Sequence, residues 1–114
     1  MRHHKKIRKF NRVKNQREAL LRSLALSLVL KEKIRTTESK AKSLRPFVER
    51  IVTYGKKGTL ASKRDIISLV GITGIKKVGE LAERFKTRTG GYTRIVKLPR
   101  RMSDGSTMAV IEFV

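Results

Sequence analysis

The sequence predicts an α/β protein of the α+β kind, in which about four helices pack against a small three-stranded mixed sheet. Apolar residues recur at helical spacing through most of residues 15–86. After Gly91 the pattern changes to the alternation that is typical of strands. Because 114 residues suffice for one modest core, we expect a single globular domain over residues 18–114, preceded by a basic arm over residues 1–17.

The predicted arm is rich in positive charge. Residues 1–17 contain eight Lys and Arg and no acid, and their few apolar side chains cannot bury enough surface to fold alone. A solvated tail is the plainer interpretation, but the charge favours an arm that becomes ordered against nucleic acid. The residues expected to bind there are Arg2, His3, Lys5, Lys6, Arg8, Lys9, Asn11, Arg12 and Arg17.

The first predicted helix spans residues 15–30. Leu21, Leu24 and Leu28 stand at i, i+3 and i+7, and the second half of the segment is apolar nearly all round. Such a helix is expected to lie at the centre of the fold. A short β-branched segment around Ile34 follows and predicts a brief strand.

A second helix is predicted to begin after Thr37, whose hydroxyl can cap the first turn. The glycine-lysine segment at residues 55–58 is typical of a helix end. Pro46 lies between these two signals. It is expected to kink the helix or to start a second one.

Two shorter helices are predicted next, over residues 60–70 and 75–86, with the glycine-containing segment 71–74 between them. Thr59 can cap the first of the two. Its residues expected to face inward are Leu60, Ile67 and Val70.

A C-terminal hairpin is predicted from residues 92–99 and 107–114, with Asp104-Gly105 as the turn signal. Alternation places Ala109, Ile111 and Phe113 on one face of the last strand. With the strand near residue 34, this hairpin would complete the three-stranded sheet.

The formal net charge of +20 and a pI near 11.4 restrict the possible partners. So many positive charges repel one another in a folded chain, and a polyanionic partner would neutralise them. Nucleic acid is the commonest such partner. An anionic membrane surface fits less well, because the sequence has no apolar run of 18 residues and its cations are spread along the chain. The absence of cysteine and of an apolar leader favours the cytoplasm.

Catalysis has little support in the sequence. The only histidines, His3 and His4, lie in the arm, and the nine acidic residues are scattered. No phosphate-binding loop is present. A basic ribonuclease is the enzymatic alternative and would need an acid-base pair in a groove. We therefore predict no catalytic residue, no metal site, no cofactor and no small-molecule substrate.

The segment Arg88-Thr89-Gly90-Gly91-Tyr92-Thr93-Arg94-Ile95 lies where the helical pattern changes to strands. Two interpretations are open: a left-handed helix cap followed by a turn, or a close contact with a phosphate backbone. The residues of this segment alone support the two interpretations equally. Tyr92 could stack on a base, but we expect it to pack against the sheet.

A second basic region runs from residue 84 to residue 101 without an acid. Its position in a loop and strands favours structured RNA over duplex DNA, with 2′-hydroxyl groups within reach of Thr93 or Asn11. An architectural DNA-binding protein remains the alternative. The residues predicted to bind RNA in this region are Arg88, Gly90, Gly91, Arg94, Arg100 and Arg101.

Several motifs in a fixed order resemble the L17 family of bacterial large-subunit ribosomal proteins. They are Met1-Arg2-His3, Asn11-Arg12, Thr36-Thr37 with Lys40-Ala41-Lys42 and Leu44-Arg45, and Gly90-Gly91-Tyr92-Thr93-Arg94-Ile95. The resemblance spans nearly the whole chain. The sequence departs from the family pattern at Ile7, where members usually carry glycine, and over residues 13–17, where a Ser/Thr-rich stretch ends in His-Arg.

The resemblance implies a structural role in the large ribosomal subunit. The expected partners are the large-subunit (23S) ribosomal RNA and neighbouring ribosomal proteins, close to the exit of the peptide tunnel. It also implies an α/β fold with a small mixed sheet. From the spread of the cations and the lack of a long apolar run, no membrane partner is expected.

Overall fold

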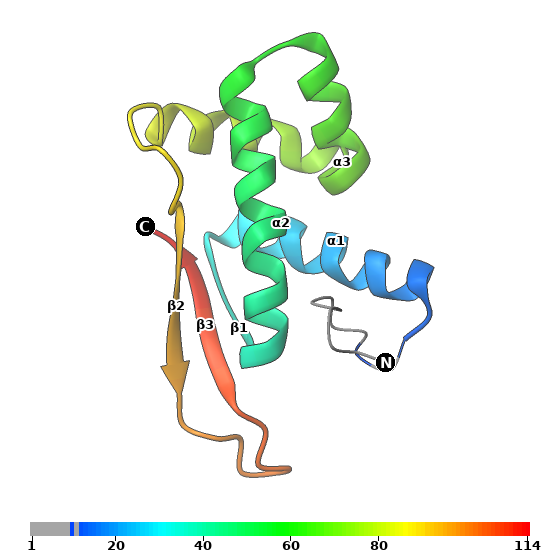
Figure 1. Ribbon diagram of the computed structural model, residues 1–114, viewed down its shortest axis with the longest axis vertical. Helices are drawn as coiled ribbons and strands as arrows, with labels where there is room; N and C mark the ends of the chain where they lie inside the picture. Colours follow the sequence, from blue (N-terminus) through cyan, green and yellow to red (C-terminus); the bar gives the residue numbers. More distant parts are fainter. Residues whose placement is uncertain (1–9, 11) are drawn as a thin grey trace, which may run out of the picture.

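A computed structural model describes residue 10 and residues 12–114 of the chain. Its helices and strands, shown in Figure 1, are α1 (Lys14–Lys31), β1 (Lys33–Thr37), α2 (Glu38–Lys57), α3 (Leu60–Arg84), β2 (Thr93–Leu98) and β3 (Met108–Phe113). The predicted arm residues that lie outside the described part are Arg2, His3, Lys5, Lys6, Arg8, Lys9 and Asn11.

Both predicted threonine caps are confirmed. Thr37 Oγ1 accepts a hydrogen bond from the backbone N–H of Lys40 at 3.3 Å, and Thr59 Oγ1 accepts one from that of Ser62 at 3.1 Å. The predicted end of α2 is also confirmed, since Gly58 takes a left-handed conformation with φ of 66° as its C-cap. Local sequence chemistry thus determines where α2 begins and ends and where α3 begins.

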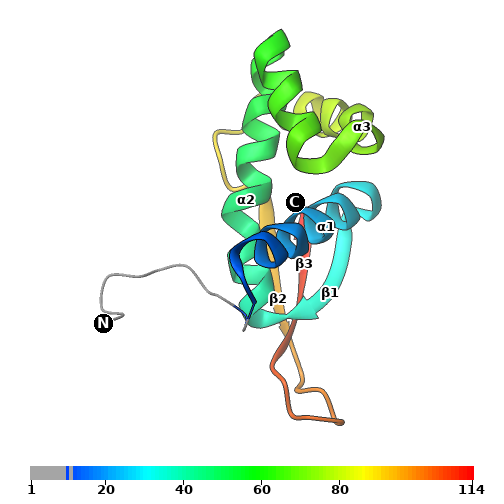
Figure 2. The ribbon, with the colours of Figure 1, turned by 90° about the vertical axis from the view of Figure 1, so that its right-hand side faces the viewer.

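The predicted count of four helices is wrong: the described residues form three. Residues 60–84 form one helix, α3, which changes direction at Gly71, whose φ of 75° and ψ of 176° are non-helical (Figure 2). Helical geometry resumes immediately after this residue, so segment 71–74 is a bend and not a loop. Leu60 and Ile67, predicted to face inward, are exposed, while Val70 is buried as predicted.

The centre of the fold is α2, and the prediction that the first helix would be central is wrong. The second helix contacts α1, α3 and all three strands. The first helix buries only Ala25, Leu28 and Val29, and its Leu30 is 46% exposed. Pro46 does not start a second helix, because α2 continues through it with the proline ring exposed.

The sheet is antiparallel throughout, which corrects the predicted mixed sheet. Its order is β1-β3-β2, and the central β3 runs opposite to both neighbours. Ile111 of β3 pairs with Ile34 on one side and Ile95 on the other. Figure 2 shows α1 and α2 in front of one face of the sheet.

The two faces of β3 differ as the alternation predicts. Ala109, Ile111 and Phe113 are buried on the helical side. The pairing register places Val96 opposite Val110 on the outer face, where Val96 is 46% exposed. This outer face is therefore partly apolar and open to a partner.

An ion-pair cluster joins the end of α1 to α3. Glu32, at a left-handed φ of 64°, receives Lys77 Nζ at 2.7 Å and Arg84 Nη1 at 2.6 Å on its two carboxylate oxygens. The hydrogen bond from Lys77, followed by that from Arg84, lowers the pKa of Glu32. These pairs connect elements that are far apart in sequence.

Glu32→Gln is expected to lower the free energy of unfolding at neutral pH. Because the carboxylate is about a third exposed, at 35%, we expect the loss to be about 1 kcal/mol or less. A lowered folded-state pKa stabilises the protein above the ordinary glutamate value of 4.5, and this contribution disappears as the pH falls through the folded-state pKa. Thermal unfolding measured from pH 7 to pH 2 should therefore show that the stabilities of the parent protein and the Glu32→Gln variant become equal in acid. A difference in stability that stays constant with pH would contradict this role of Glu32.

Gly79→Ala is expected to stabilise the protein by about 0.5–1 kcal/mol, because alanine is the better helix former. Gly79 lies within α3 with ordinary helical φ, and a Cβ there would meet no atom within 4 Å. Gly55→Ala is the matched control, because its Cβ would lie 2.9 Å from Val78 Cγ1. Thermal melts should shift upward for the first variant and downward for the second; shifts of the same sign would contradict this packing.

Candidate nucleic-acid interface

The glycine turn, residues 85–92, connects the end of α3 to the start of β2. Gly90 and Gly91 have φ values of 78° and 62°, in the left-handed region that favours glycine. A Cβ at either position would meet no atom within 4 Å. The fold therefore requires glycine here for its backbone angles and not because neighbouring atoms crowd the site.

Two side chains of α2 hold this turn. Lys56 Nζ donates to the carbonyl oxygen of Arg88 at 2.6 Å and to the hydroxyl of Tyr92 at 3.0 Å. Glu49 Oε1 accepts from the backbone N–H of Tyr92 at 3.0 Å. Sequence reasoning missed both residues, because a lysine near a helix end and a glutamate on a helix carry no signal of a contact so distant in sequence.

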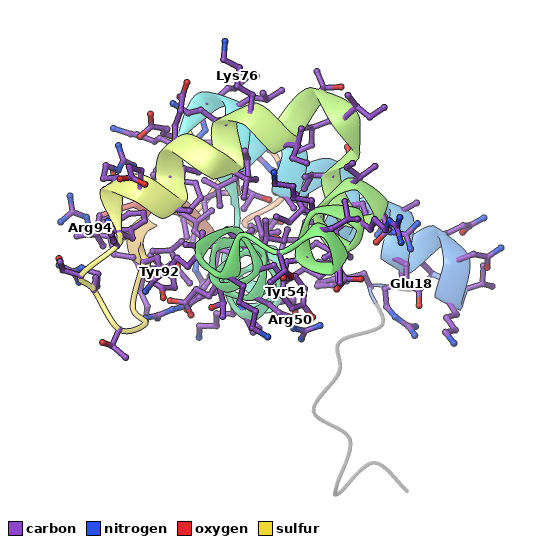
Figure 3. All side chains as sticks on the ribbon, turned by 90° about the horizontal axis from the view of Figure 1, so that it is seen from above. Glu18, Arg50, Tyr54, Lys76, Tyr92 and Arg94 are labelled. Atoms are coloured by element: carbon purple, nitrogen blue, oxygen red, sulfur yellow. The ribbon has the colours of Figure 1, made fainter. Side chains whose placement is uncertain are left out.

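Tyr92 packs against the core, as predicted, and is not available to stack on a base. Its side chain is 3% exposed, and its ring lies 5.2 Å from that of Phe85, centroid to centroid. Figure 3 labels it between the turn and the body of the protein. The hydrogen bond from Lys56 lowers the pKa of the Tyr92 hydroxyl, against the opposing effect of burial.

Thr93 cannot serve the ribose contact that the sequence suggested. The residue is 2% exposed, and its Oγ1 is buried without a hydrogen-bond partner within the described residues. Alternation along β2 directs this side chain inward, opposite Phe113. The other candidate for that contact, Asn11, lies outside the described residues.

The two arginines that flank the glycines remain exposed. Arg88 Nη1 donates to the carbonyl oxygen of Gly91 at 3.3 Å and so closes the turn on itself. Arg94, labelled at the surface in Figure 3, pairs through Nε with Glu112 Oε1 of β3 at 3.2 Å. A guanidinium carries five N–H donors, so each arginine retains donors that can bind phosphate.

Arg100 and Arg101 belong to the hairpin loop, residues 99–107, which connects β2 to β3. Arg101 binds Asp104 in a bidentate manner, with Nε–Oδ1 at 3.0 Å and Nη2–Oδ2 at 2.8 Å. These bonds hold the pKa of Asp104 far below its usual range, with the backbone N–H of Ser106 adding to the effect. Arg100 is exposed on the same loop.

The described site residues lie in three separate places. The glycine turn and the hairpin loop stand at opposite ends of β2, and the start of α1, near Arg12 and Arg17, lies apart from both (Figure 1). Arg12 donates to the carbonyl oxygen of Phe10 at 3.0 Å. The predicted residues therefore do not form one patch; they would contact an extended partner at several points.

Residue 10 and residues 12–114 contain no cluster of three or more His, Asp or Glu that could hold a metal ion. No helix in the same part combines the length and hydropathy needed to span a membrane.

The described part of the chain also contains cavities. One of about 440 Å³ lies beside the hairpin loop, and one of about 190 Å³ lies between α2 and α3.

Comparison with known proteins identifies close relatives over the whole chain. The sequence profile of the family described as "Ribosomal protein L17" matches residues 20–114. Three relatives bear the name "Large ribosomal subunit protein bL17". That of Hydrogenobaculum sp. (strain Y04AAS1) is 56% identical over 100% of this chain and 99% of its own. The relative from Bradyrhizobium diazoefficiens is 50% identical and covers 100% of this chain and 84% of its own. The relative from Shouchella clausii is 46% identical and covers 93% of this chain and 97% of its own.

Proposed function

Because the chain belongs to the ribosomal protein L17 family, we propose that it binds large-subunit (23S) ribosomal RNA through the arm, the glycine turn and the hairpin loop. The protein is a non-enzymatic structural constituent of the large ribosomal subunit. Ribosomal RNA and neighbouring ribosomal proteins are therefore its partners. The family resemblance supports a location near the exit of the peptide tunnel.

The observation that carries RNA binding is the charge of +20 on a folded chain. Within the described residues, acids such as Glu32, Glu38 and Glu112 are already paired with lysines or arginines. The excess cations therefore remain for an external polyanion. Phosphate contacts of this kind position a protein along RNA without reading its bases.

The separation of the site residues supports a structured RNA as the partner. The turn and the hairpin loop project from opposite ends of β2, and a folded RNA can contact both ends at once. A duplex-DNA reader usually presents one basic helix to a major groove. All of Arg88, Gly90, Gly91, Arg94, Arg100 and Arg101 instead lie in the loop and strand region.

A salt series with the full-length protein tests this proposal. The affinity for a large-subunit RNA fragment is expected to fall steeply as salt rises, by about 0.7 to 0.9 in the log–log slope for each phosphate contact. Duplex DNA of equal length is the matched competitor and should displace the RNA poorly at physiological salt. Equal competition by DNA, or release from the large subunit in a mild salt wash, would contradict it.

A further inference from the structure

The cavity of about 440 Å³ beside the hairpin loop lies on the outer face of the sheet, opposite the helices. Its floor includes Leu98 of β2 and Met108 of β3, which are paired partners across the sheet. Met102 lines the cavity from the loop and is fully exposed, at 101%. The cavity thus combines an apolar floor with an apolar side chain that no part of the described fold covers.

Three arginines line the same cavity, and no acid does. Arg35 comes from the edge strand β1, whereas Arg100 and Arg101 come from the loop. This arrangement suits a negatively charged group at the rim of an apolar site. Its volume lies in the range of about 300–1,000 Å³ that small-ligand sites occupy.

The loop that carries these arginines is held in one shape by its own hydrogen bonds. The backbone N–H of Arg101 donates to Ser106 O at 2.9 Å, and that of Gly105 donates to Arg101 O at 2.8 Å. The bidentate pair with Asp104 fixes the plane of the Arg101 guanidinium. A planar cation held in place loses little freedom when a ring stacks on it.

We propose that this cavity holds a single unpaired nucleobase of RNA that stacks on the guanidinium of Arg101, with Arg35 and Arg100 binding its flanking phosphates. The proposal rests on the function proposed above and adds a subsite to it. A base offers an apolar ring for the floor, a π-face for the guanidinium and a phosphate on either side. An acidic peptide would match the charge alone, and a base within a duplex could not enter the cavity.

The test uses the full-length protein and two RNA hairpins that differ by one base. One hairpin contains a single bulged adenosine, and the other contains an abasic bulge at the same position, with the same number of phosphates. We expect the adenosine bulge to bind about ten-fold more tightly at the same salt, because stacking accounts for the difference. Equal affinity for the two RNAs overturns the proposal.

Two variants of cavity residues test whether the preference for the adenosine bulge arises at the cavity. Arg101→Lys keeps the charge but loses the planar face, so the two affinities should come within about two-fold of each other. Met102→Ala should also reduce the preference and should leave the thermal melt unchanged, because that side chain is fully exposed. Arg64→Lys, at an exposed position of α3, is the control and should retain the preference.

The outcomes separate this proposal from the general one. Salt-dependent binding of both hairpins without a preference overturns only the nucleobase subsite. A preference that Arg101→Lys and Met102→Ala leave intact also overturns it, because the base would then bind elsewhere. Failure to bind either hairpin overturns only the subsite if a large-subunit RNA fragment is still bound, and it contradicts both proposals if that fragment is not bound either. Displacement of the bulged RNA by a short polyglutamate peptide, but not by single-stranded RNA, would assign the cavity to a protein partner instead.

Discussion

Removal of residues 2–12 is expected to lower the log–log salt slope of RNA binding by about 4 to 5. This segment contains six cations, Arg2, Lys5, Lys6, Arg8, Lys9 and Arg12, and no acid. Each cation that neutralises a phosphate contributes roughly 0.7 to 0.9 to the slope, and at physiological salt the loss of affinity would be on the order of a thousand-fold. The measurement is binding of a large-subunit RNA fragment across a salt series.

The end point of the deletion follows from the structure. The predicted arm extends to residue 17, but α1 begins at Lys14, and the backbone N–H of Arg17 donates to Val13 O at 2.9 Å. A deletion through residue 17 would therefore remove the first turn of α1. A weaker RNA affinity could then come either from a less stable fold or from the lost positive charge. The division into an arm of residues 1–17 and a domain of residues 18–114 remains a prediction.

A full-length variant in which the six cations become glutamine is the matched control for chain length. It should show the same reduced slope as the deletion, and both proteins should melt at the temperature of the parent chain. If the deletion left the slope unchanged, the arm would be a solvated tail and the basic region from residue 84 to residue 101 would account for binding.

Gly91→Val is expected to destabilise the fold by about 2 kcal/mol and to weaken RNA binding. The φ of Gly91 is 62°, which a β-branched residue adopts only with strain of about 1–3 kcal/mol. Because a Cβ at this position would meet no atom within 4 Å, the loss comes from the backbone and not from a clash. Thermal unfolding and RNA binding measured on the same preparation check the two effects.

Gly91→Asn separates the two roles of this glycine, because asparagine tolerates left-handed backbone better than other residues. We expect it to recover most of the stability but not the RNA affinity, since its side chain would still occupy the space in front of the turn. Recovery of both properties would show that glycine only shapes the turn. Lys76→Ala is the neutral control, because Lys76 points away from the body of the protein (Figure 3).

Lys56 would be a poor control in that experiment. The sequence places it in the lysine-containing end of α2, where a solvated cation is expected. The structure shows that its ammonium binds both Arg88 O and the Tyr92 hydroxyl. Lys56→Met should therefore loosen the glycine turn and weaken RNA binding to a degree between those of Lys76→Ala and Gly91→Val.

The features that were predicted correctly depend on neighbours close in sequence. Thr37 and Thr59 cap helices because their hydroxyls reach the backbone three residues later. The alternation of Ala109, Ile111 and Phe113 follows from strand geometry alone. Family resemblance supplied the broader identity, because it rests on the order of many motifs at once.

The features that were missed depend on which elements meet. Leu60 and Ile67 fit a helical apolar face, but α3 has several apolar positions and turns Ile66 and Val70 inward instead. Strand direction was undetermined, because pairing with β3 decides it. The contacts of Lys56 and Glu49 with the glycine turn join positions too distant in sequence for any local pattern to reveal.

The central position of β3 constrains when the protein can fold during its own synthesis. Both β1 and β2 pair only with β3, and β3 is the last element of the chain. Because Ile34 pairs with Ile111, β1 has no partner strand until β3 has been translated. Until then the hydrogen-bonding groups of β1 remain unpaired, and the apolar surface of α2 that faces the sheet stays uncovered. Formation of the sheet is thus a late event, because β3 follows every other described element in the chain, and a growing chain of this protein depends on its helices for early structure.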